Sequence, residues 1–182
     1  MSRSVGKEFE KKFKDDWIRT VDSFIYRLND QLSGYKFNSK NICDFICYDY
    51  PNLFLIECKT HKGASLPFRN ITQYDDLIKF VGIKGIRVGI ICWLYEKDIV
   101  LYIPISTVSK MKKDNKKSVG IKSIEDGYNI KVIPSKKKVF YMDSDYSILF
   151  LSILSKKLSI NITFYKLYII NHSNSTKSFK IE

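Results

Sequence analysis

The chain has 182 residues, long enough for one domain with a sizeable core, and 45% of them are hydrophobic. Its 31 Lys and Arg residues against 19 Asp and Glu give a formal net charge of +12, and 14% of the residues are aromatic. This composition excludes a disordered chain and argues against a generic acidic cytosolic enzyme. The positive charge predicts a polyanionic partner, which is DNA, RNA or an anionic membrane surface.

The sequence favours a cytoplasmic protein without membrane association. The first fourteen residues are charged throughout and lack the apolar core of a signal peptide, and the longest apolar run, residues 147–154, is far too short to cross a membrane. Three of the four cysteines lie in apolar, strand-like runs, where a free thiol behaves as a small hydrophobe. We therefore expect free cysteines in a reducing compartment.

In chain order, the first predicted element is an amphipathic helix over residues 5–32, which Ser33-Gly34 would end. Apolar residues recur there at three- and four-residue steps: Phe9, Phe13, Trp17, Val21, Leu28 and Leu32. Two strands follow at residues 41–48 and 53–60, with a turn at Pro51-Asn52 between them.

The next predicted helix begins after an Asn70 or Thr72 cap and runs to about residue 81. The strongly apolar residues 87–95 and 99–104 then predict a hairpin. This order of elements indicates an α/β core. After Ser109 the chain is rich in lysine, and residues 146–158 predict a last helix or strand. The economical division is one globular domain with a basic, partly loose C-terminal extension.

The segment that indicates chemistry runs from Asp44 to Lys59. Because side chains alternate along a strand, Glu57 and Lys59 share a face with the apolar residues that precede them. Antiparallel pairing of the two strands would bring Asp44 beside Glu57. Two close carboxylates repel each other, and a divalent cation with a preference for oxygen ligands, such as Mg²⁺, removes that cost.

The Cys58 carbonyl would supply a further oxygen to such a cation. We expect Lys59 to help deprotonate a metal-bound water or to stabilise a pentacovalent phosphorane. The alternative interpretation of an isolated Glu-x-Lys is an exposed strand face with a weak ion pair.

Asp44 with Glu57-Cys58-Lys59 resembles the D-x(n)-(D/E)-x-K core of the PD-(D/E)XK nuclease superfamily, although the leading Pro is absent. The wider order of motifs resembles the RecU family of Holliday junction resolvases. The further matching segments are residues 6–10, 62–67, 73–77, 85–93 and 99–104. The resemblance implies an α/β, restriction-endonuclease-like core with a mixed central β-sheet flanked by helices. It predicts a nuclease domain over residues 1–145, with the matching core at about 6–111, and an extension of unknown role over 146–182.

The resemblance also implies roles for individual residues. Asp44 and Glu57 would be metal ligands and Lys59 the catalytic lysine. Gln73 would lie at the edge of the active site and orient water or phosphate, and Glu10 would reach the metal through a water molecule. Two alternatives stay open: Glu10 as an ordinary helix carboxylate paired with Lys14, and Gln73 as a capping-box partner of Asn70.

RecU carries a long stalk between its first helix and the motif Asp, and here only residues 33–41 are available for one. Lys36 and Lys40 belong to this shortened stalk, and we expect them, with Lys62 and Arg69, to contact DNA. The shortening weakens the inference of four-way junction selectivity and leaves the nuclease inference intact.

The leading hypothesis is a Mg²⁺-dependent, structure-selective DNA endonuclease, with Mn²⁺ as a substitute cation. It would act as a homodimer on branched DNA, as a Holliday junction resolvase. The alternatives are a restriction, flap or nicking nuclease of the same fold, and a catalytically inert basic DNA-binding protein. Membrane association through the lysine runs is the weakest alternative, because no amphipathic basic helix accompanies them.

Overall fold

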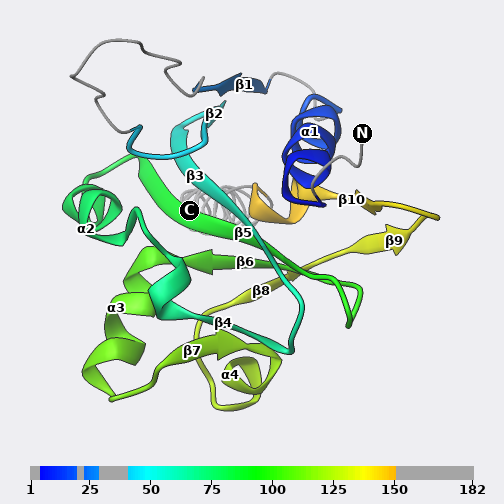
Figure 1. Ribbon diagram of the computed structural model, residues 1–182. Coiled ribbons are helices and arrows are strands. Elements are labelled where there is room, and N and C mark those ends of the chain that lie inside the picture. Colours follow the sequence, from blue (N-terminus) through cyan, green and yellow to red (C-terminus); the bar gives the residue numbers. More distant parts are fainter. Residues whose placement is uncertain (1–4, 20–22, 29–40, 151–182) are drawn as a thin grey trace, which may run out of the picture. The chain divides into compact units, whose positions relative to one another are not determined.

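The computed structural model describes residues 5–19, 23–28 and 41–150 (Figure 1). The chain divides into two compact units, Met1–Tyr146 and Ser147–Glu182, and the first of these contains the predicted catalytic segment. The shortened stalk with Lys36 and Lys40 lies outside the described residues, as does most of the element predicted at 146–158.

A six-stranded mixed β-sheet is the centre of the first unit. Its strands, in spatial order, are β1 (Phe24–Arg27), β2 (Phe45–Asp49), β3 (Asn52–His61), β5 (Ile86–Leu94), β6 (Ile99–Pro104) and β8 (Lys131–Ile133). Strands β3 and β5 are parallel, and every other neighbouring pair is antiparallel. The hairpin predicted from residues 87–95 and 99–104 is present as β5 and β6.

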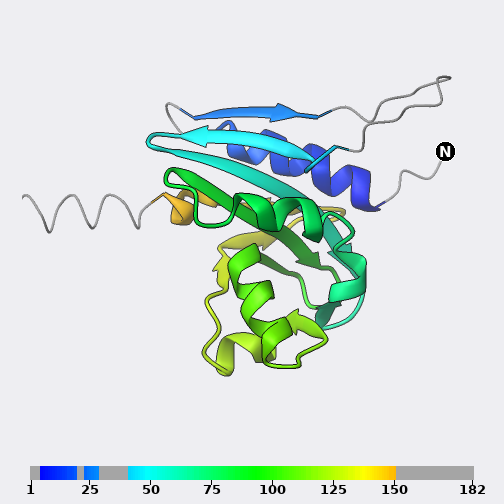
Figure 2. The ribbon, with the colours of Figure 1, turned by 90° about the vertical axis from the view of Figure 1, so that its left-hand side faces the viewer.

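Helices lie on both faces of this sheet (Figures 1 and 2). The helices of the described residues are α1 (Val5–Trp17), α2 (Tyr74–Leu77), α3 (Ile105–Lys113), α4 (Ile121–Glu125) and the short 3-10 helices η1 (Phe68–Asn70), η2 (Ile78–Phe80) and η3 (Tyr146–Leu149). Two small ribbons complete the fold: β4 (Ser65–Pro67) with β7 (Ser118–Gly120), and β9 (Ser135–Lys137) with β10 (Met142–Ser144). The predicted α/β class, with a mixed central sheet flanked by helices, is confirmed.

The alternation of β3 divides the core into two layers. On one face Phe54 packs against Trp17 of α1, with ring centroids 5.4 Å apart, and Phe13 contacts Phe45 of β2 at 5.1 Å. On the other face Leu55 joins an aliphatic cluster with Val108 of α3. Burial of large apolar side chains on both faces holds β3 rigidly, at about 1.5–3 kcal/mol for each. The four cysteines are free and buried within these layers, as the sequence predicts.

The predicted helix over residues 5–32 is too long: α1 ends at Trp17, and Phe24–Arg27 form the edge strand β1. Ile25 of β1 is buried opposite Cys47, whereas the neighbouring Phe24 and Tyr26 are exposed. This two-residue alternation competes with the helical period in the sequence. Pairing with β2 satisfies the backbone hydrogen-bonding groups of residues 24–27 and thereby favours the strand over the helix.

Two other predicted boundaries differ from the structure. Strand β2 begins at Phe45 rather than at residue 41, and the helix predicted up to residue 81 is the short α2 followed by η2. Gln73 is itself the N-cap of α2, so it is not the capping-box partner of Asn70. The lysine-rich part of the chain after Ser109 contains the end of α3, β7, α4 and three further strands, including β8 of the main sheet.

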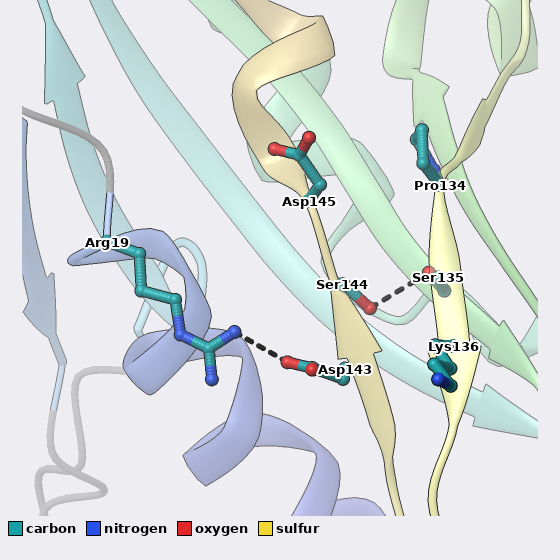
Figure 3. A pocket seen from close by; sticks show the side chains of 7 residues that line it. All are labelled: Arg19, Pro134, Ser135, Lys136, Asp143, Ser144 and Asp145. Atoms are coloured by element: carbon teal, nitrogen blue, oxygen red, sulfur yellow. Dashed lines mark hydrogen bonds and ion pairs between the residues drawn. The ribbon is translucent and has the colours of Figure 1, made fainter.

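A buried aspartate joins α1 to the β9–β10 ribbon. Asp16 is 3% exposed and accepts the Ser144 backbone N–H at 3.0 Å. Its carboxylate also pairs with Lys12 at 2.5 Å and with Arg19 at 3.1 Å. Figure 3 shows Arg19 reaching across to Asp143 of β10, and Ser144 bonded to Ser135 of β9. The ribbon is therefore fixed to α1 by charge-assisted hydrogen bonds.

Replacing Asp16 by Ala is expected to lower the free energy of unfolding by about 3 kcal/mol, because breaking a buried ion pair leaves the partner Lys12 undercompensated. The matched control is Asp15→Ala, which removes the exposed neighbouring carboxylate and should change stability by less than about 0.5 kcal/mol. Urea unfolding of both variants measures the difference. Equal stabilities would contradict the anchoring role.

Candidate active site

The pairing of β2 with β3 places Asp44 next to Glu57. The Asp44 backbone N–H donates to the Ile56 carbonyl at 3.1 Å, one residue beyond the Phe45–Ile56 pair of the ladder. The two carboxyl groups lie within reach of a hydrogen bond between them. The expected juxtaposition of these two side chains is thus present in the fold.

Cys58 ties the Asp44 side chain to the central strand. Its backbone N–H donates to Asp44 Oδ2 at 2.8 Å, while its thiol is buried. Because the N–H and C=O of one strand residue point to the same side, the Cys58 carbonyl is directed toward the same edge as Asp44. Three oxygen-bearing groups therefore converge beyond the start of β2.

Glu57 is completely buried, and Lys59 is its close partner. The Lys59 Nζ lies 2.6 Å from Glu57 Oε1, and the Lys59 side chain is 23% exposed. Both Glu57 oxygens are closed off from solvent, and neither has a hydrogen-bond partner of good geometry among the described residues. The Lys59 contact is therefore an ion pair without directional hydrogen bonding, and Glu57 keeps unused acceptor capacity.

Burial raises the pKa of both carboxyl groups. The pKa of Glu57 rises to about 7, first because of burial and second because of the Asp44 charge, while Lys59 opposes the shift. The pKa of Asp44 is also raised by burial, against the stabilising N–H of Cys58. Buried carboxyl groups with raised pKa values, next to a lysine, are typical of functional sites.

The residues present fit a small divalent cation. Two carboxylates and a backbone carbonyl are hard oxygen donors, and a cation would neutralise their repulsion and satisfy the Glu57 oxygens. Within residues 5–19, 23–28 and 41–150, no group of three or more His, Cys, Asp or Glu side chains is arranged to hold a metal. Such a donor set suits Mg²⁺, which binds through one or two carboxylates and keeps several waters.

Glu10 lies close enough to raise the pKa of Asp44, but the hydrogen-bond partner of its carboxylate is Arg27. Arg27 of β1 donates two hydrogen bonds to Glu10 Oε2, at 3.2 Å from Nε and 2.6 Å from Nη2. The alternative pairing with Lys14 is not the one found. Sequence reasoning missed Arg27 because the residue fell inside the predicted helix; the alternation of Phe24–Arg27 was the available signal.

Gln73 bonds to its neighbour Thr72. At the N-cap of α2, its Oε1 accepts a hydrogen bond from the Thr72 hydroxyl at 2.5 Å. Its expected role at the edge of the active site stays a prediction.

The two described lysine and arginine candidates for DNA binding are exposed. Lys62 follows β3 directly, and its ammonium lies 3.6 Å from the Glu96 carboxylate, a weak surface pair. Arg69 is exposed on η1. Lys62 is three residues beyond the catalytic lysine candidate, and its expected contact with DNA stays a prediction.

Comparisons with known proteins find likenesses among solved structures. No protein-family model matches the chain, and no curated protein matches it. Among solved structures, the chain is similar to Hjc, a Holliday junction resolvase from the archaeal hyperthermophile Archaeoglobus fulgidus, at 16% identity and a TM-score of 0.41. The match covers 56% of this chain and 78% of that one. The functional argument therefore rests on the residues of the site.

None of the helices in the described residues combines the length and the apolar character needed to span a bilayer.

Without metal, the stability of the protein should depend on the Glu57 proton. In the folded protein Glu57 keeps this proton up to about pH 7, whereas the unfolded chain releases it near 4.5. The contribution of protonated Glu57 to the stability of the fold is therefore complete below pH 4.5 and is lost as the pH rises through 7. We expect the free energy of unfolding of Glu57→Gln to be about 3 kcal/mol larger than that of the wild type at pH 8, and to differ little from it near pH 4.5.

Chemical denaturation in metal-free buffer at several pH values measures this difference. The control is Glu125→Gln, which neutralises an exposed carboxylate on α4 and should follow the wild type at every pH. If the stability difference between Glu57→Gln and the wild type is the same at pH 8 as at pH 4.5, the raised pKa of Glu57 is refuted.

Proposed function

We propose that this protein is a Mg²⁺-dependent DNA endonuclease of the PD-(D/E)XK superfamily that acts on branched DNA. The observation that carries the proposal is the fully buried Glu57 carboxyl beside the half-buried Asp44, with the Lys59 Nζ 2.6 Å from Glu57 Oε1. A structural role for this arrangement would be costly, because burying ionisable groups without full pairing destabilises a fold. The order of motifs that resembles RecU supports the same conclusion.

In this proposal, Asp44, Glu57 and the Cys58 carbonyl hold the cation. When bound, Mg²⁺ supplies a Lewis acid that polarises a phosphate oxygen and lowers the pKa of a bound water. The Cys58 N–H fixes one oxygen of Asp44 by a 2.8 Å hydrogen bond, which leaves the other for the cation. Glu57 must give up its proton to bind, which favours the bound state at pH values near or above its pKa of about 7.

Lys59 has two functions in the proposed reaction. Its ammonium compensates the Glu57 carboxylate in the resting site. A bound cation would supply that compensating charge and would leave Lys59 to interact with the phosphate. Its partial exposure allows this movement without disrupting the core. A lysine beside the scissile phosphate stabilises the developing negative charge and orients the attacking water.

The DNA substrate follows from charge and from the family resemblance. A net charge of +12 supplies sequence-independent contacts to phosphates, so shape rather than base sequence would guide binding. Symmetric cleavage of a four-way junction requires two active sites, and a homodimer supplies them. The second candidate function keeps the site and changes the substrate to flap or duplex DNA, which the short stalk segment favours.

Metal binding can be measured apart from cleavage. Millimolar Mg²⁺ should raise the melting temperature of the wild type, because a ligand of the folded state stabilises it by mass action. Asp44→Asn removes a ligand charge and should abolish the shift. Asp75→Asn is the control: it changes an exposed carboxylate in the first turn of α2 and should keep the wild-type shift. Equal shifts in both variants would place the cation elsewhere.

Cleavage of a four-way junction, a flap and a linear duplex, each with Mg²⁺ or with EDTA, tests the reaction and its substrate. We expect Mg²⁺-dependent cleavage that falls about a hundredfold or more in Asp44→Ala and Lys59→Ala, and is unchanged in Asp75→Ala. Equal cleavage of linear duplex would overturn the selectivity for branches. Absence of cleavage with both Mg²⁺ and Mn²⁺ would favour the inert DNA-binding protein.

A further inference from the structure

A second site lies on the opposite face of the sheet from Lys59. A pocket of about 490 Å³ is lined by residues from the first turn of α1, the end of β5 with the residue after it, and the β9–β10 ribbon. Its lining includes Glu8, Trp93, Tyr95, Lys137, Val139 and Phe140. Its size is in the range of ligand sites, and none of these residues takes part in the proposed cleavage chemistry.

Aromatic rings form the wall of this pocket, and they are held in place. The ring centroids of Trp93 and Tyr95 lie 6.1 Å apart in an edge-on arrangement, and Phe9 of α1 supports Trp93 at 5.8 Å. Trp93 is 6% exposed, and its Nε1 has no hydrogen-bond partner in the described part of the chain. A fixed aromatic wall favours a flat, unsaturated ligand that stacks.

The outer rim of the pocket is unusually apolar for a surface turn. Val139 and Phe140 are 81% and 83% exposed, at the turn between β9 and β10. The Lys138 N–H closes this turn with a 2.8 Å bond to the Tyr141 carbonyl, so the turn is held together by its own backbone. A neighbouring exposed Val and Phe beside an aromatic pocket indicate a surface that a ligand covers.

The charges around the pocket select among flat ligands. Lys137 lines the pocket, and its ammonium lies 2.7 Å from Asp98. The next residue, Lys138, is exposed. Glu8 of α1 adds one carboxylate to the lining of the pocket. The pocket thus has lysines at its rim and aromatic rings with one carboxylate in its lining. This arrangement suits a nucleotide whose phosphates lie at the rim and whose base lies in the pocket.

The register of the sheet connects this pocket to the cleavage site. Trp93 pairs with Thr60, the residue after Lys59, and the two side chains lie on the α1 face, whereas Lys59 and its partner Cys92 lie on the other. The pocket therefore begins one residue beyond Lys59, around the end of β3. A DNA strand cut at Lys59 would need to turn around this end to place a base there.

We propose that the pocket of Trp93, Tyr95 and Phe140 binds one unstacked nucleobase of the DNA strand next to the cleavage site. The proposal rests on the proposed function for its ligand, DNA, and it adds a contact to a base that the cleavage chemistry does not require. Base–aromatic stacking is tolerant of sequence, so the site would recognise an unpaired base and not a particular one.

Binding in EDTA tests this proposal independently of cleavage. The probes are a fluorescein-labelled thymidine oligonucleotide and an abasic oligonucleotide with the same phosphates. We expect the wild type to bind the thymidine strand at least about fivefold more tightly, and Phe140→Ala to lose this preference. Phe140 is largely exposed, so its removal leaves the core intact. Tyr50→Ala, which removes an exposed ring just before β3 begins, at the opposite end of that strand, is the matched control and should keep the preference.

Tryptophan fluorescence gives a second measurement. The chain has two tryptophans, and Trp17 is fully buried, so quenching by the thymidine strand reports on Trp93. Equal affinity for both probes, without quenching, would overturn the base site whether or not the protein cleaves DNA. A dimer that dissociates in Phe140→Ala, with unchanged binding of both probes, would also overturn it and assign the surface to a second copy of the chain. Preferential thymidine binding by a protein that cleaves nothing would support the base site and refute the nuclease.

Discussion

The cost of burying the Glu57 carboxyl beside Asp44 is the constraint on which the rest of the structure depends. Leu53 and Leu55, on the same face of β3, show what this strand would contain if stability alone mattered. Glu57 is as buried as its apolar neighbours, yet a carboxylate and a lysine are its close partners. Stability is given up locally at this position, as is typical of functional sites, and the proposed metal site would account for it.

The surrounding sheet keeps this arrangement in place. Asp44 is fixed twice, by its backbone bond to Ile56 and by the Cys58 N–H on its carboxylate. Strand β3 is held between antiparallel β2 and parallel β5, and aromatic and aliphatic layers fill its two faces. Because neither neighbour can slip by one residue without exposing a buried face, the carboxyl groups cannot relax apart. The rigidity of the core thus maintains the repulsion that a cation would relieve.

The central strands could be predicted from sequence because their signal is local. The two-residue alternation from Leu53 to Lys59 defines the faces, and the turn at Pro51-Asn52 dictates which residues of β2 they meet. Residues 24–27 were misassigned because their apolar positions suit both a helix and a strand, and only pairing with β2 distinguishes the two. The three-residue strands after Ser109 are too short for a periodic pattern. The aromatic pocket joins Glu8, Trp93 and Phe140 from three distant segments, and no local pattern announces such a contact.

The two sites together change how the excess positive charge should be understood. Lysines hold phosphates of any DNA, so charge alone gives no selectivity for a branched substrate, and the stalk that would supply it in RecU is shortened here. A pocket for an unstacked base would supply selectivity by a different physical route. Extracting a base from a continuous duplex costs a few kcal/mol, whereas a base at a branch point is already unpaired. A protein with Lys59 on one side of the end of β3 and the Trp93 pocket on the other would therefore favour branched over linear DNA, with the difference in affinity set by the cost of unstacking.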